Sequence, residues 1–203
     1  VYRRFDGDVG WMIRSSFKHI SPTMWFAYIS NKNNEKVHNQ AKRKVLSSIL
    51  AGHIIKSGEG YAGAMDTYLR RVFQNTKSVT VEDIHMLAEN FSENEIMDIK
   101  SSPWGYCILK KRNQFRAKCA IDGIPQRHNA SPKYCMGCTN HLTTSDNINE
   151  ILINIGNDLK AISTPNIPKS YFFESYKTVR SALVLLKDLK ADKEIIDMIS
   201  RKL

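Results

Sequence analysis

The sequence predicts a mainly α-helical protein that is interrupted by one irregular insert containing the cysteines. Three observations favour this fold class. Apolar residues recur with a period near 3.6 on both sides of the insert, which is typical of amphipathic helices. The periodicity fails between residues 101 and 142, where glycine, proline, asparagine and all four cysteines gather. No convincing run of alternating apolar and polar residues predicts a strand.

Three helices are expected before the insert, with apolar stripes over residues 37–54, 65–73 and 81–91. An S-G-E-G segment ends the first of them, because glycine favours a turn over a helix. Thr80 suits the N-cap of the third helix, and Asp83 follows three residues later. The S-E-N-E segment that comes next reads as a capping box and predicts a short fourth helix.

Helical periodicity resumes after the insert. Apolar stripes cover residues 148–162, 172–186 and 195–199, and an S-T-P-N-I-P segment separates the first two because proline cannot continue a helix. The chain therefore divides into four segments, at residues 1–31, 32–100, 101–142 and 143–203.

The chain is strongly basic. Thirty Lys and Arg residues against twenty Asp and Glu residues give a net charge of +10 and an isoelectric point of about 9.5. This balance favours a polyanionic partner, with nucleic acid first among them, although a basic protein can also be merely soluble. No stretch approaches the roughly 18 apolar residues of a membrane helix. The N-terminus has neither a signal-type apolar core nor an initiator Met. We expect an intracellular protein without membrane contact, cut from a longer chain.

The four cysteines follow the spacing C-x11-C-x15-C-x2-C. Cys135 and Cys138 can direct two sulfurs at one tetrahedral ion, and the glycine between them allows the turn. Cys107 and Cys119 are separated by eleven residues, which suits a hairpin or loop that brings them together. The pattern predicts a zinc-stabilised insert. Four protein ligands leave no position for an activated water, so the zinc is expected to be structural.

Other interpretations of the cysteines remain open. His128 or His141 can each replace one cysteine as a ligand. Two disulfides require an oxidising compartment, for which the chain gives no indication. Four unrelated buried thiols are the least specific alternative.

Basic residues gather between residues 110 and 133 of the insert, against Asp122 as the lone acidic residue. A metal-pinned loop of this charge is a candidate contact for the phosphate backbone of DNA. A solvated basic face is the simpler alternative. The candidate DNA-binding residues are Lys110, Lys111, Arg112, Arg116, Lys118 and Arg127.

Near the N-terminus, the segment F-K-H-I-S-P-T-M-W-F-A-Y-I-S predicts a capped helix that carries a tyrosine. Ser21 suits the N-cap and Pro22 the first helical position, so His19 lies in the preceding turn and Tyr28 about two turns into the helix. A tyrosine that attacks a phosphodiester preserves the energy of the broken bond in a phosphotyrosyl ester. Hydrogen-bonding neighbours such as His19 must stabilise the charge that develops on the phosphate. A packed Tyr28 and a turn histidine are the simpler alternatives.

This segment resembles the last active-site segment of the tyrosine recombinase (phage integrase) family, in which a histidine precedes the nucleophile by nine positions. Phe17, Lys18, His19 and Tyr28 fit that frame. The resemblance implies that His19 contacts the scissile phosphate and that Tyr28 is the catalytic nucleophile. The two clamping arginines, the hairpin lysine and the H-x-x-R box of the family have no assigned counterpart here, and Lys18 stands where glycine is usual. We therefore expect the 203 residues not to cleave DNA unaided.

The cysteine-bearing region resembles the C-terminal extensions of large integrases of bacterial mobile elements, where a GYC…C…C..C region follows the catalytic tyrosine. The matching text runs from Trp104 to Cys138. Together the resemblances imply the C-terminal part of a site-specific DNA recombinase, with residues 1–31 as the end of its catalytic domain. DNA and other recombinase subunits would be its partners, in the bacterial cytoplasm. The alternative is a non-catalytic, zinc-stabilised helical module that binds DNA or protein.

Overall fold

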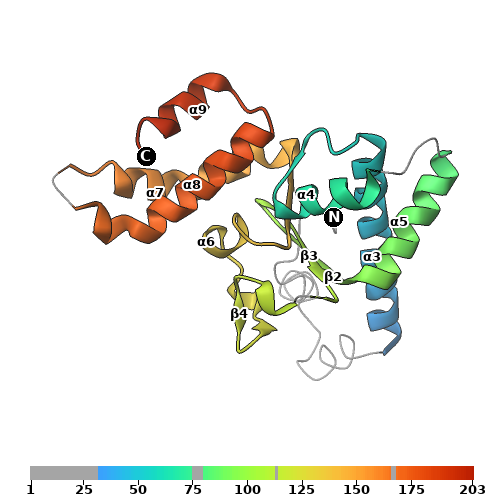
Figure 1. The fold of residues 1–203 in the computed structure, drawn as a ribbon. Helices are drawn as coiled ribbons and strands as arrows, with labels where there is room; N and C mark the ends of the chain where they lie inside the picture. Colours follow the sequence, from blue (N-terminus) through green and yellow to red (C-terminus); the bar gives the residue numbers. More distant parts are fainter. Residues whose placement is uncertain (1–31, 75–79, 113, 166–167) are drawn as a thin grey trace, which may run out of the picture.

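A computed structural model describes residues 32–74, 80–112, 114–165 and 168–203 of the chain. Seven α-helices and a small antiparallel sheet make up these residues (Figure 1). The mainly helical class predicted from the periodicity is confirmed. Among the described residues, no helix combines the length and the apolar character that crossing a membrane requires.

The helices before the insert are α3 (Lys32–Ile55), α4 (Ala64–Phe73) and α5 (Val81–Glu95). The turn after α3 contains Ser57 and Gly58 at positive φ, 49° and 77°, which is incompatible with a continued helix. The side chain of Thr80 accepts a hydrogen bond from the amide of Asp83, and the Asp83 side chain bonds back to the Thr80 amide. This capping box confirms the predicted start of α5.

The predicted fourth helix is wrong. Residues 92–95 are the last turn of α5, and Ser92 is buried within that helix instead of capping a new one. The chain turns extended at Ile96 and continues as β2 (Ile96–Ser102), so the segment 32–100 is not helical throughout.

The sheet corrects the expectation that the chain has no strand. Its order is β1 (Tyr61–Ala62), β6 (His141–Thr144), β3 (Gly105–Lys110) and β2, with all neighbouring strands antiparallel. The strands are two to seven residues long, and β3 is nearly apolar throughout, so alternation is too short to recognise. The segment 101–142 therefore contributes β3 and the start of β6 to a sheet and is not irregular throughout.

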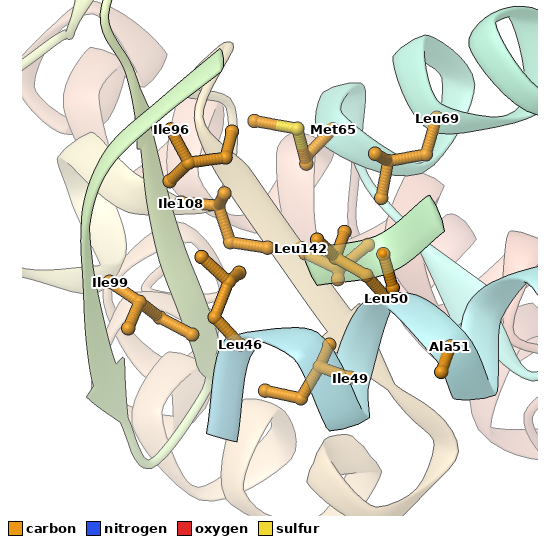
Figure 2. Packing of buried hydrophobic residues seen from close by; sticks show 11 residues of the cluster. Leu46, Ile49, Leu50, Ala51, Met65, Leu69, Ile96, Ile99, Ile108 and Leu142 are labelled. Carbon is orange, nitrogen blue, oxygen red and sulfur yellow. The ribbon is translucent and has the colours of Figure 1, made fainter. Parts of the chain in front are cut away.

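One face of this sheet packs against α3 and α4. Figure 2 shows Leu46, Ile49 and Leu50 of α3 directed towards Ile108 and Leu142 of the sheet. Residues from six elements thereby share one buried cluster. Its buried members are Leu46, Ile49, Leu50, Ala51, Met65, Leu69, Ala88, Ile96, Ile99, Ile108 and Leu142.

The C-terminal helices are α7 (Ile148–Ile162), α8 (Phe173–Asp188) and α9 (Lys193–Ser200), as the periodicity predicts. They bury a second cluster that includes Ile155, Leu186 and Ile199. Met136 from the insert also belongs to this cluster. The short helix α6 (Pro132–Cys135) of the insert also contacts α7 and α8 (Figure 1).

The rest of the insert consists of short elements. A hairpin of β4 (Ala120–Ile121) and β5 (Ile124–Pro125) turns at Asp122 and Gly123, both at positive φ. The helix α6 (Pro132–Cys135) follows and leads into β6. Four 3-10 turns complete the described secondary structure, at Gln114–Arg116, Arg127–Asn129, Ser145–Asn147 and Lys169–Phe172.

Candidate metal centre and basic surface

The four cysteines come from separate elements but line one cavity. Cys107 lies on β3, Cys119 directly precedes β4, Cys135 ends α6, and Cys138 lies in the loop before β6. The cavity has a volume of about 30 Å³, which is room for a single water-sized occupant. The thiols are free. The structure thus brings together the side chains that were selected by their spacing in the sequence.

Local backbone hydrogen bonds place three of these cysteines. The Cys138 amide donates to the Cys135 carbonyl at 2.9 Å, and the His141 amide donates to the Cys138 carbonyl at 3.2 Å. The Gln126 amide donates to the Cys119 carbonyl at 3.0 Å, which closes the hairpin of β4 and β5. Both turns form between residues close in sequence.

Cys107 reaches the cavity through its register in the sheet. It pairs with Lys100 on β2 and with His141 on β6, and paired residues of neighbouring strands share one face. The next residue, Ile108, points to the opposite face and into the core beneath α3. The sheet therefore separates the hydrophobic core from the cysteine cavity.

The two histidines considered as substitute ligands lie in different environments. His128 is exposed on a 3-10 turn and is not part of the cavity wall. His141 lines the cavity and is 2% exposed, and its Nε2 lies 3.1 Å from the Trp104 carbonyl oxygen. Burial lowers the pKa of His141 to about 4, so its ring is neutral at neutral pH.

Burial also controls the protonation of the thiols. It raises the pKa of Cys107 to about 11, although the Arg127 guanidinium opposes this shift. Burial raises the pKa of Cys119 and Cys135 above its usual range as well. These three thiols are therefore protonated at neutral pH in the metal-free protein. Within the described ranges, no three Cys, His, Asp or Glu side chains stand close enough, as placed, to hold a metal ion.

A charged network joins the cavity to α3. Arg127, which lines the cavity, donates through Nη1 to Asp98 on β2, and Lys42 on α3 lies 3.2 Å from the same carboxylate. Burial raises the pKa of Asp98, but the two cations outweigh that effect and leave the pKa below its usual range. The carboxylate therefore stays charged and links the insert, the sheet and α3.

The candidate DNA-binding residues fall into two groups. Lys110 is half-buried with its ammonium 4.2 Å from the centre of the Tyr68 ring, and Arg127 is engaged with Asp98. Both side chains thus have partners within the protein. The other four are exposed, namely Lys111, Arg112, Arg116 and Lys118. Of these, Lys111 donates through Nζ to the Glu93 carbonyl, and the Arg116 guanidinium lies 5.9 Å from the centre of the Phe115 ring.

The proposed catalytic residues His19 and Tyr28 lie outside the described residues. Four polar residues at or beside the cavity were not predicted from the sequence: Asn140, Lys100, Asp98 and Lys42. Asn140 follows Cys138 by two residues, so proximity to the cysteine pair was the available signal. Asp98 and Lys42 carry no such signal, because only the folded sheet brings them near the insert.

Comparison of the chain with protein-family models, with curated proteins and with solved structures gave no significant match.

Proposed function

We propose that the four cysteines hold one structural zinc ion. The observation that carries this proposal is their convergence on one small cavity from three strands or turns and a helix. Cysteine thiolate is a preferred ligand of Zn²⁺, and four of them close a tetrahedral shell. Zinc would release the thiol protons and draw the sulfurs to about 2.3 Å from the metal, closer together than in the structure.

The metal would act as a cross-link. It would join β3 of the sheet to the hairpin of β4 and β5, to α6 and to the loop before β6. These elements are short, and Ala117 is the only buried residue that the structure describes between residues 114 and 135, so hydrophobic burial alone supplies little stability to that part of the insert. The centre would thereby fix the exposed basic residues of the insert in one arrangement.

We propose further that the chain is the C-terminal part of a site-specific tyrosine recombinase. The support is the N-terminal segment around His19 and Tyr28 together with the cysteine-bearing region that follows it. In this reaction the Tyr28 phenol oxygen attacks the scissile phosphorus, and the resemblance implies a 3′-phosphotyrosyl bond with release of a 5′-hydroxyl. His19 would donate a hydrogen bond to the phosphate as charge develops on it.

The exposed cations of the insert would contact DNA phosphates beside the reacting strand. Lys111, Arg112, Arg116 and Lys118 are available for this role because their side chains face solvent. Such contacts orient a protein on a duplex without reading its sequence. The helical region around the centre would also bind neighbouring recombinase subunits.

Metal analysis tests the first proposal. The purified protein should contain one zinc ion per chain, and removal of zinc by a chelator should increase hydrogen exchange across residues 103–142. Cys135→Ser should lower the zinc content, whereas Ser131→Ala in the same segment should not. The zinc proposal would be contradicted if the amide hydrogens of the insert exchanged as slowly after chelation as before it.

Salt dependence tests the contact with DNA. Each phosphate contact contributes about −0.9 to the slope of log affinity against log salt concentration. Replacing the four exposed cations with glutamine should therefore reduce the slope by up to about 3.6. Replacing Lys187, Lys190, Lys193 and Lys202, which are exposed on the C-terminal helices and turns, is the matched control. Absence of duplex binding at low ionic strength would favour the alternative, a protein-binding module.

Covalent trapping tests the recombinase proposal in the full-length protein. Tyr28→Phe should abolish the protein–DNA adduct on a suicide substrate while leaving DNA binding within about twofold, since only the attacking oxygen is lost. Tyr171→Phe, at an exposed tyrosine far along the chain, is the control. An adduct that survives Tyr28→Phe would place the nucleophile elsewhere.

A further inference from the structure

Three polar side chains that line the cysteine cavity have buried atoms without a hydrogen-bond partner among the described residues, namely Asn140, Arg127 and, through Nδ1, His141. Asn140 is 1% exposed, and neither its amide nitrogen nor its amide oxygen has a partner among the described residues. The Arg127 side chain is 18% exposed, and its Nε and Nη2 are buried and likewise unpaired in the described part of the chain. Buried donors of this kind are nearly always hydrogen-bonded in folded proteins. Their position indicates an acceptor inside the cavity.

The cavity wall contains four cysteine sulfurs, beside the hydroxyl groups of Ser101, Ser102 and Tyr134, that can accept these hydrogen bonds. A neutral thiol accepts hydrogen bonds weakly, whereas bonds to an ionised acceptor are about twice as strong as neutral ones. The donors therefore suit thiolates bound to a metal better than the protonated thiols of the metal-free protein.

The charge of the surroundings agrees with this interpretation. A zinc ion with four thiolates carries a net charge of −2, which is costly to bury without compensation. Arg127 and Lys100 both line the cavity, and Lys42 balances the single negative charge of Asp98. The net charge of Arg127, Lys100, Lys42 and Asp98 is therefore +2, which balances the −2 of a zinc ion with four thiolates.

We propose that Asn140 and Arg127 donate hydrogen bonds to the metal-bound thiolates and thereby favour four cysteine ligands over a centre in which His141 replaces one. This inference rests on the proposed zinc site and names the residues that position its ligands. A neutral histidine in place of a thiolate would leave one positive charge of the wall unbalanced. His141 is the competing nitrogen ligand of the wall, because its Nε2 lies at the Trp104 carbonyl while its buried Nδ1 has no partner among the described residues.

Asn140→Leu separates this positioning role from a purely structural one. Leucine has a similar size but no donor, so the zinc dissociation constant should rise 10- to 100-fold, measured by competition with a chromogenic chelator. The urea midpoint of the metal-free protein should stay equal or rise, because an unpaired buried amide has been removed. A structural role would instead lower that midpoint and leave the zinc affinity unchanged.

Arg127→Gln should weaken zinc binding by a similar factor, while Arg112→Gln, at an exposed arginine of the same insert, should not. In the Co²⁺-loaded protein, the sulfur-to-metal absorption should have the intensity of four thiolates. The band should move to longer wavelength in Asn140→Leu, because a thiolate that loses a hydrogen bond gives up its electron more easily.

The outcomes distinguish the two proposals. A wild-type protein without metal would overturn both the zinc site and this inference. Zinc bound equally tightly by the wild type, Asn140→Leu and Arg127→Gln would overturn the positioning role alone. A cobalt spectrum of three thiolates and one histidine would overturn the preference for four cysteines while leaving a metal site in place.

Discussion

Arg70→Ala should destabilise the protein far more than Arg71→Ala, although both arginines lie on α4 and are exposed. Arg70 donates through Nε to both carboxylate oxygens of Asp66, at 3.0 and 2.9 Å, and through Nη1 to the Ser57 carbonyl at 2.9 Å. Asp66 is 7% exposed and also contacts His53 at 2.8 Å. Arg70 therefore holds the turn after α3 and shields a buried carboxylate, whereas Arg71 donates through Nε to the Thr67 carbonyl of its own helix.

The magnitude follows from these contacts. A hydrogen bond to a charged group contributes about 1.5–3 kcal/mol, which the 47% exposure of the Arg70 side chain reduces to about 1 kcal/mol. The bond to the turn carbonyl and the partly unpaired carboxylate left behind add about 1–2 kcal/mol. The total is about 2–3 kcal/mol, or a shift of about 1 M in the urea midpoint.

Equilibrium urea unfolding followed by circular dichroism measures this shift. Arg71→Ala is expected within about 0.5 kcal/mol of the wild type, as for most surface substitutions. Arg70→Lys should recover less than half of the loss, because an ammonium lacks the planar fork that reaches carboxylate and carbonyl together. Equal midpoints for Arg70→Ala and Arg71→Ala would refute the reasoning.

Two further predictions concern the sheet and its pH dependence. Gly105→Ala should lower the free energy of unfolding by about 3 kcal/mol in urea titration, because φ is 135° and a Cβ would lie 2.5 Å from the Leu142 carbonyl oxygen. The control Gly156→Ala, in open space on α7, should instead raise the free energy of unfolding by about 0.5–1 kcal/mol. An unchanged free energy of unfolding in Gly105→Ala would contradict the strand register. The pKa of His141 is about 4 in the folded protein, below its value in the unfolded chain. The stability that comes from keeping its ring neutral is therefore fully present above pH 6.5 and is lost as the pH falls towards 4. In the presence of a chelator, the free energy of unfolding should fall by up to about 1.4 kcal/mol per pH unit between pH 6.5 and 4. His141→Gln should have a flatter profile, and identical slopes would rule out this assignment.

The helices and their ends could be predicted because their causes are local. The capping box of Thr80 and Asp83 and the glycine turn after α3 act within a few residues. The S-E-N-E segment misled the prediction for the same reason, since its local pattern is that of a helix start. Only the preceding turns of α5, which already bury Ser92, decide that the segment ends a helix.

The candidate site also has features that depend on local sequence and features that depend on long-range contacts. The cysteine spacing alone selected Cys107, Cys119, Cys135 and Cys138, because the turns that place the last three form within short stretches of chain. The orientation of Cys107 depends on pairing between strands more than thirty residues apart, from 107 to 141.

The amino-acid pattern was sufficient for the helical class and most helix boundaries, since these depend on neighbours a turn or two away, and the cysteine spacing picked out side chains that line one cavity. The fold alone decided that Arg127, Asp98 and Lys42 meet beside the cavity and that Asn140 is buried there. Contacts between residues far apart in the chain arise from burying the sheet against α3 and α4, and no local periodicity encodes which partners that burial brings together.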